Sequence, residues 1–283
     1  MDHATIGPSR LNRPLKSLAS WIAHMRTAPI PVLACTAEAV RELAENQDAV
    51  DAHLLAEMVG DDPLLTLKLL SHVGTTSRRE TDVETVVGAL VLMGIGPFFR
   101  KFGELATIED ALADMPEALE GARAVLRRAH RGARFALGFA AHRLDPDAAV
   151  IHEAALLHNF AELLLWCHAP VLALEIARRQ AADPTLRSHV VQRGVLGTEL
   201  AELQQGLMKV WRLPELLIRL GNANDAERTQ VRYVLLGVRV ARHTAAGWDN
   251  AALPDDVADV AELLQLGPTP ALNLLHDIDA ASP

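Results

Sequence analysis

The stretch VIHEAALLHNFAELLLWCH, residues 150–168, is the longest nearly unbroken apolar run in the sequence. Leu, Ala and Trp dominate it, and no Gly or Pro occurs before Pro170. A run of this kind predicts a buried helix of about five turns, around which the rest of the chain packs.

A few polar residues interrupt this apolar run. At roughly 100° per residue, an arc of about 120° of the predicted helix contains four of them. They are His152, His158, Asn159 and Glu162. A polar stripe on a buried helix predicts that this side of the helix faces a cavity or a site.

The composition indicates a globular protein built from helices. The chain has 283 residues, of which 50% are hydrophobic and only 4% aromatic. Ala and Leu dominate and β-branched runs are few, which favours helix over sheet, so we expect an all-α fold. The net charge of -9 argues against binding to nucleic acid or to an anionic membrane, because both require a positive surface.

The two cysteines, Cys35 and Cys167, are far apart and form no CxxC motif, so neither a disulfide framework nor a thiolate metal site is predicted. The N-terminal residues contain no apolar signal region, and no uncharged apolar run reaches the roughly 18 residues of a membrane span. We therefore expect a cytoplasmic protein that does not insert into a membrane.

Proline, glycine and charge patterns divide the chain. We expect an N-terminal extension over 1–28, a first helical lobe over 29–110 and a second over 122–228, with further helices over 229–283 packed on the second lobe. The acidic segment 108–121 is the expected hinge. The clearest helix start is Asp61-Asp62-Pro63, where an acidic cap precedes a proline at the first helical position.

A basic stripe is predicted on a long helix over 122–144. Arg123, Arg127, Arg131 and Arg134 recur there at helical spacing. The stripe predicts either a docking face for an acidic partner or a phosphate, or an ordinary solvated face.

Several segments also follow one another in an order and spacing that chance does not readily produce. They are Ile30-Pro31, DPLLTLKLL at 62–70, ALVLMG at 89–94, LLHN at 156–159, AEL at 201–203 and WRLPE at 211–215. Together they resemble the HD-related output domain, HDOD, a bacterial signalling module. The resemblance covers residues 29–228 and implies a multi-helix HD-like fold with two helical lobes, the second being a degenerate HD-like lobe.

The same resemblance implies a metal site that this chain has largely lost. HD-type metal phosphohydrolases carry an adjacent His-Asp pair, of which His158 matches the first residue while Asn159 replaces the second. His130 stands where these relatives have an early His ligand. Leu200 stands where many family members have His, and Asn224-Asp225 where a His-His pair often lies.

The remaining donors are too weak for hydrolysis at a divalent metal. A hydrolytic metal needs strongly donating ligands and an open position for water, whereas an Asn carbonyl is a weak ligand and Leu has no donor. His152 and His158 do not make an HExxH zinc motif, because a spacing of six places them roughly 120° apart on a helix. We expect a degenerate pocket formed by His130, His152, His158, Asn159, Leu200, Asn224 and Asp225, with no bound metal or cofactor and no catalytic residue.

Two functions follow from these observations. The first is a non-catalytic bacterial signal-transduction or scaffold protein that binds other signalling proteins, for which the arginine stripe is a candidate surface. The alternative is a residual metal-dependent phosphohydrolase or nucleotide sensor that uses His130, His158 and Asp225. The identity of the partner and the oligomeric state are left open.

Overall fold

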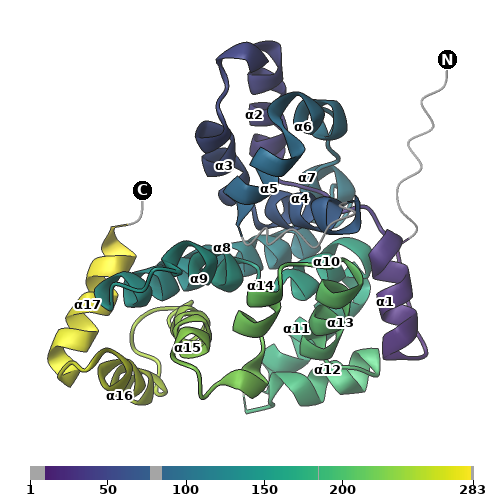
Figure 1. Cartoon of the computed structure of the whole chain (residues 1–283). Helices are drawn as coiled ribbons and strands as arrows, with labels where there is room; N and C mark the ends of the chain where they lie inside the picture. The colour runs from purple at the N-terminus through teal and green to yellow at the C-terminus, as the bar shows by residue number, and fades with distance from the viewer. Residues whose placement is uncertain (1–9, 77–84, 184, 282–283) are drawn as a thin grey trace. The chain divides into compact units, whose positions relative to one another are not determined.

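A computed structural model describes residues 10–76, 85–183 and 185–281. These residues form helices joined by short turns, and no strand occurs among them apart from an isolated parallel bridge between Val32 and Thr107. The predicted all-α fold is confirmed. The described residues divide into two compact units. The helices of both units are labelled in Figure 1.

The first unit combines the described parts of 1–125 with 159–213. Its helices, with the first part of α8 (Pro116–His142), are α1 (Leu18–Thr27), α2 (Ala34–Glu45), η1 (Gln47–Ala49), α3 (Ala52–Gly60), α4 (Pro63–Thr76), α5 (Val86–Met93), α6 (Ile95–Phe102), α7 (Ile108–Ala111), α10 (Phe160–His168), α11 (Pro170–Ala182), α12 (Ser188–Leu196) and α13 (Leu200–Val210).

The core of the first unit is built on α10, in which Phe160, Leu163, Leu164 and Leu165 are at most 1% exposed. Helices α4, α11 and α13 pack against it. Helix α1 is joined to the end of α12 by a buried tryptophan. The Trp21 indole N–H donates a hydrogen bond to the Leu196 carbonyl at 3.1 Å.

The predicted helix start at Asp61-Asp62-Pro63 is confirmed, and Asp62 does more than cap it. The Asp62 carboxylate accepts hydrogen bonds from Leu64 N (2.8 Å) and Leu65 N (3.2 Å) in the first turn of α4, and from Leu33 N (2.8 Å) before α2. Burial raises the pKa of Asp62, and the backbone hydrogen bonds oppose this by stabilising the charged form. This carboxylate therefore fixes the segment before α2 to the start of α4.

The second unit combines 126–158 with 214–283, as far as these are described. Its helices, with the rest of α8, are α9 (Ala148–Leu156), α14 (Glu215–Leu220), η2 (Ala223–Asp225), α15 (Thr229–His243), α16 (Leu253–Leu264) and α17 (Pro268–Ala280). Helices α8 and α15 approach closely through glycine, since a Cβ at Gly237 would lie 2.7 Å from the Gly132 carbonyl oxygen.

The prediction of one continuous helix over 150–168 is wrong. Leu157, His158 and Asn159 form a turn that separates α9 from α10. The predicted arc of polar residues assumed an unbroken helix, so it does not describe how His152 and Glu162 are oriented relative to each other.

Among the described residues, only the stretch Ala148–His168 has the length and apolarity of a membrane span, and 67% of its most apolar window is buried inside the protein. The core helix of a soluble protein has the same properties. The stretch also carries two glutamates, Glu153 and Glu162.

Each compact unit is assembled from separate stretches of the chain, whereas the expected lobes are consecutive segments. The first unit takes in 159–213 in addition to the N-terminal helices, and the change of unit within α8 comes after Val125. The predicted hinge over 108–121 instead contains the short helix α7 and the start of α8.

Candidate functional site

The turn between α9 and α10 carries His158 and Asn159, the two residues expected from the resemblance to correspond to a His-Asp pair. The Leu157 N–H donates to the Glu153 carbonyl at 2.9 Å, and the His158 N–H donates to the Ala155 carbonyl at 3.2 Å, which closes α9. Helix α10 then begins with Asn159 at its N-cap position, where the Asn159 carbonyl accepts from the Glu162 N–H at 3.1 Å. Both His158 and Asn159 are half-buried.

Other predicted site residues lie on elements of the second unit. His130 is in α8 and His152 is in α9, and both are half-buried. Helix α9 packs against α14 and α15, and η2, which carries Asn224 and Asp225, packs against α15.

The Asn224-Asp225 pair is shaped by a local turn. The Asn222 side chain accepts a hydrogen bond from the Asn224 N–H at 3.2 Å and donates one to the Asp225 carboxylate at 3.0 Å. Asn224 is exposed and Asp225 is half-buried. A metal at Asp225 would compete with this hydrogen bond, which makes the pair a poor substitute for two histidines.

Leu200 belongs to the first unit and is 8% exposed. It is the first residue of α13, where Glu199 and Glu202 form a capping box, and the Gln192 side chain accepts a hydrogen bond from its N–H at 3.0 Å. Its side chain therefore fills an apolar position at a helix start.

The residues expected to form the pocket do not all belong to one compact unit. Within the described ranges, no group of three or more His, Cys, Asp or Glu side chains is placed to hold a metal ion. The compact units assign His130, His152, His158, Asn224 and Asp225 to one unit, and Asn159 and Leu200 to the other. Asn159 and Leu200 would contribute no charge to such a centre.

The arginine stripe is only partly a surface available for docking. The Arg131 guanidinium makes a bidentate ion pair with Asp279 of α17 at 2.9 Å and donates to the Thr244 carbonyl at 3.0 Å. Arg134 lies 3.8 Å from the same carboxylate. Burial raises the pKa of Asp279, but the two arginines outweigh this effect and hold that pKa below its ordinary value.

Arg123 and Arg127, in contrast, are exposed. Arg123 lies 3.8 Å from Glu109, which is a weak surface ion pair. The candidate partner-binding stripe is thus reduced to these two residues, because Arg131 and Arg134 anchor α17.

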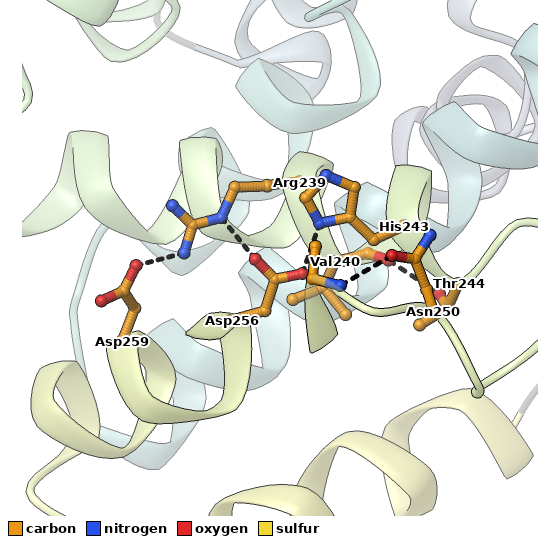
Figure 2. Close-up of polar contacts among 8 residues, drawn as sticks. Arg239, Val240, His243, Thr244, Asn250, Asp256 and Asp259 are labelled. Carbon is orange, nitrogen blue, oxygen red and sulfur yellow. Dashed lines mark hydrogen bonds and ion pairs between the residues drawn. The ribbon is translucent and has the colours of Figure 1, made fainter. Parts of the chain in front are cut away.

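A charged cluster that the sequence reading missed lies between α15 and α16 (Figure 2). Asp256 is 2% exposed, and its carboxylate pairs with Arg239 Nε at 2.7 Å and His243 Nδ1 at 2.6 Å. Arg239 also forms an ion pair with Asp259. The sequence signal for this cluster was the i, i+4 spacing of Arg239 and His243 on one helix and the i, i+3 spacing of Asp256 and Asp259 on the next.

The family model of the HDOD domain matches residues 30–226, which is more than half of the chain. No curated protein matches the chain.

Several solved structures share its fold at low sequence identity. The MmoQ response regulator from Methylococcus capsulatus str. Bath has a TM-score of 0.63 at 21% identity, over 88% of this chain and 98% of that one. A virulence factor from Campylobacter jejuni subsp. jejuni has a TM-score of 0.63 at 16% identity, over 93% and 99%. An HDOD domain protein of unknown function from Geobacter sulfurreducens has a TM-score of 0.50 at 13% identity, over 94% and 98%. At such identities the likeness shows the fold alone.

Proposed function

Because this chain belongs to the HDOD domain family, we propose that it is a non-catalytic signal-transduction or scaffold protein of the bacterial cytoplasm, which acts by binding other proteins. The similar structure from Methylococcus capsulatus is named a response regulator, and a signalling role for this chain agrees with that name. Because a fold can host many functions, the proposal depends on the residues of the former site.

The single observation that carries the proposal is the chemistry at Asn159 and Leu200. Phosphoester hydrolysis at a metal requires charged ligands to hold the ion and to activate water. A neutral amide at the α10 N-cap and a buried Leu at the start of α13 supply neither. These two residues therefore favour a function that does not depend on a bound metal, and binding to another protein requires no metal ligands.

The direct test is affinity purification of the tagged full chain from its native cell. The proposal expects one or more signalling proteins to be captured in constant proportion, and to be captured equally by a variant with His158→Ala and Asn159→Ala. A chain that captures no specific partner under conditions where it is folded would contradict the proposal.

The alternative, a residual phosphohydrolase or nucleotide sensor, makes opposite predictions. It expects metal at a fixed ratio in the purified protein and manganese-dependent phosphate release, both lost when His158 is replaced by Ala. The proposal expects neither, and elemental analysis together with a phosphate-release assay separates the two.

A further inference from the structure

Helix α17 is held on the second unit by few buried side chains. Two of its 13 residues, Ala271 and Leu275, are buried, whereas seven of the 12 residues of α16 are buried. An element with few buried apolar contacts can open at a low cost in free energy while the rest of the protein stays folded. We therefore expect α17 to leave its position more easily than α16 does.

The part of α8 that α17 contacts is cationic. Arg131 donates from Nε and Nη2 to the Asp279 carboxylate of α17, both at 2.9 Å, and Trp248 donates a further hydrogen bond to the same carboxylate. The guanidinium carbon of Arg131 lies 5.9 Å from the centre of the Phe135 ring. Between residues 126 and 142, α8 contains four arginines and no Asp or Glu. This part of α8 is therefore suited to binding an acidic side chain.

Aromatic and apolar contacts surround the ion pair. The Trp248 ring lies edge-on to Phe135 at 6.4 Å, and it lies 4.0 Å from the His276 ring of α17. A Cβ on Gly138 would overlap Ile278 of α17, so this glycine allows α17 to approach α8 closely. We call this part of the second unit the α17-docking surface, defined by Arg131, Arg134, Phe135, Gly138 and Trp248.

Helix α17 does not satisfy both arginines of the α17-docking surface. Arg134 lies 3.8 Å from the Asp279 carboxylate, which is longer than a hydrogen bond. Its Nε atom is buried and makes no hydrogen bond with any described residue. A buried donor of a charged group is costly when it has no acceptor. The surface can therefore bind a ligand with a second carboxylate more favourably than it binds α17.

The other charged groups around the α17-docking surface do not cancel its positive charge. Next to it along the chain are the cations Arg127, Arg128 and Arg242 and the exposed acids Asp249 and Asp277. Helix α16, which packs against α17, carries Asp256 and Asp259 paired with Arg239, Glu262 paired with Arg232, and the exposed Asp255. Asp277 and Asp279 would leave with α17, so the surface that remains would be positive around Arg131 and Arg134.

We propose that the α17-docking surface binds an acidic amphipathic helix of a partner protein, which displaces α17 and places carboxylates beside both Arg131 and Arg134. Helix α17 shows the pattern that fits, because Ala271, Leu275 and Ile278 lie at i, i+4 and i+7 and Asp279 follows them. Nucleic acid lacks such apolar side chains, and the net charge of -9 would repel an anionic bilayer. This inference rests on the proposed function, since it names the surface and the kind of partner.

The test uses the full chain and two fluorescein-labelled peptides. The acidic peptide copies residues 268–281, and the basic peptide has Lys in place of both aspartates. Asp279→Lys removes the ion pair that holds α17 and opens the surface. Fluorescence anisotropy should show that this variant binds the acidic peptide at least about tenfold more tightly than the native chain does, with no gain for the basic peptide.

A matched control lies on the same helix. Asp277→Lys makes the same change in net charge at an exposed position, and it should bind the acidic peptide within about twofold of the native chain. In the Asp279→Lys chain, Arg131→Gln with Arg134→Gln should weaken the acidic peptide by at least about tenfold. Circular dichroism checks that each variant is folded.

Reversal of the ion pair shows whether α17 itself covers the surface. Arg131→Glu alone should bind the basic peptide, because its own Asp279 is then repelled. Arg131→Glu combined with Asp279→Lys restores an ion pair of opposite sense, so this double variant should bind neither peptide.

The proposal is overturned if the native chain and Asp279→Lys bind the acidic peptide equally well, or if Asp277→Lys binds it as tightly as Asp279→Lys. It is also overturned if a mixture of Asp279→Lys and Arg131→Glu sediments as a dimer while each alone is a monomer. The occupant would then be α17 of a second copy.

Capture of native partners separates this inference from the proposed function. The Asp279→Lys chain should capture more partner than the native chain, and excess acidic peptide should release it. If capture is equal and the peptide releases nothing, the α17-docking surface fails while the proposed function stands. If no chain captures a partner but the peptides bind as described, the proposed function fails while the surface stands.

Discussion

Replacement of the buried His168 by Gln should remove a large part of the loss of stability in acid. His168 ends α10 and is 2% exposed, and its Nε2 lies 2.9 Å from the Pro29 carbonyl oxygen, to which the neutral ring donates. Burial, with a smaller contribution from His24, lowers the pKa of His168 from 6.5 to about 4, against the opposing effect of the Pro29 hydrogen bond. A Gln amide can donate to the same carbonyl without titrating.

The size of the effect follows from the shift in pKa. The folded protein keeps His168 neutral, so the unfolded chain binds more protons between pH 6.5 and about 4. The free energy of unfolding is therefore unaffected by this group above pH 6.5 and falls as the pH drops through that window. This difference in the pKa of His168 between the unfolded and the folded protein corresponds to about 3 kcal/mol in the free energy of unfolding.

Urea unfolding followed by circular dichroism, repeated across that pH range, measures the effect. Between pH 6.5 and about 4, the free energy of unfolding should fall by about 3 kcal/mol more for the native chain than for the His168→Gln variant. His72, whose pKa is also lowered by burial, contributes to both curves and cancels in their difference. His189→Gln at an exposed position is the control and should follow the native curve. Parallel curves for the native chain and His168→Gln would refute the reasoning.

Two further changes probe the packing of the two units separately. Asp256→Asn removes the buried carboxylate that pairs with Arg239 and His243 and should lower the free energy of unfolding by about 2 kcal/mol, measured in urea; no loss would mean that the cluster contributes nothing. Gly121→Ala introduces a Cβ that overlaps the Trp166 ring, so it should lower the free energy of unfolding by about 2 kcal/mol. Gly60→Ala, with open space around the new Cβ, should leave the free energy of unfolding unchanged or raise it. Equal effects of the two alanines in thermal unfolding would count against the packing described here.

Much of the helical architecture could be predicted because its signals are local. The start of α4 followed from an acid before Pro63. Gly94 lies between α5 and α6, and its φ of 83°, which residues with a side chain rarely adopt, allows the chain to turn directly from one helix into the next.

The break between α9 and α10 could not be predicted from local signals. Neither Gly nor Pro occurs there, and the apolar residues on both sides favour helix. Leu157 ends α9 with near-helical angles (φ -85°, ψ -4°), and Asn159 departs further (φ -117°, ψ 22°). Packing of α9 and α10 within their respective units decides the turn, and this is a tertiary effect that periodicity does not record.

The candidate site shows the same division between local and distant information. The absence of a carboxylate at Asn159 and of a donor atom at Leu200 could be read directly from the sequence. The fate of the arginine stripe could not, because Asp279, which binds Arg131, is 148 positions away along the chain. Complementary charges on distant helices become visible only when the fold brings them together.

The central claim is that the chain acts by binding a protein and not by metal chemistry. Its most direct test is a titration of the captured partner against the full chain by isothermal calorimetry, once in EDTA and once in excess manganese. The account predicts the same dissociation constant in both conditions, and the same again for the variant with His158→Ala and Asn159→Ala. Binding that requires manganese and is lost in that variant would contradict it.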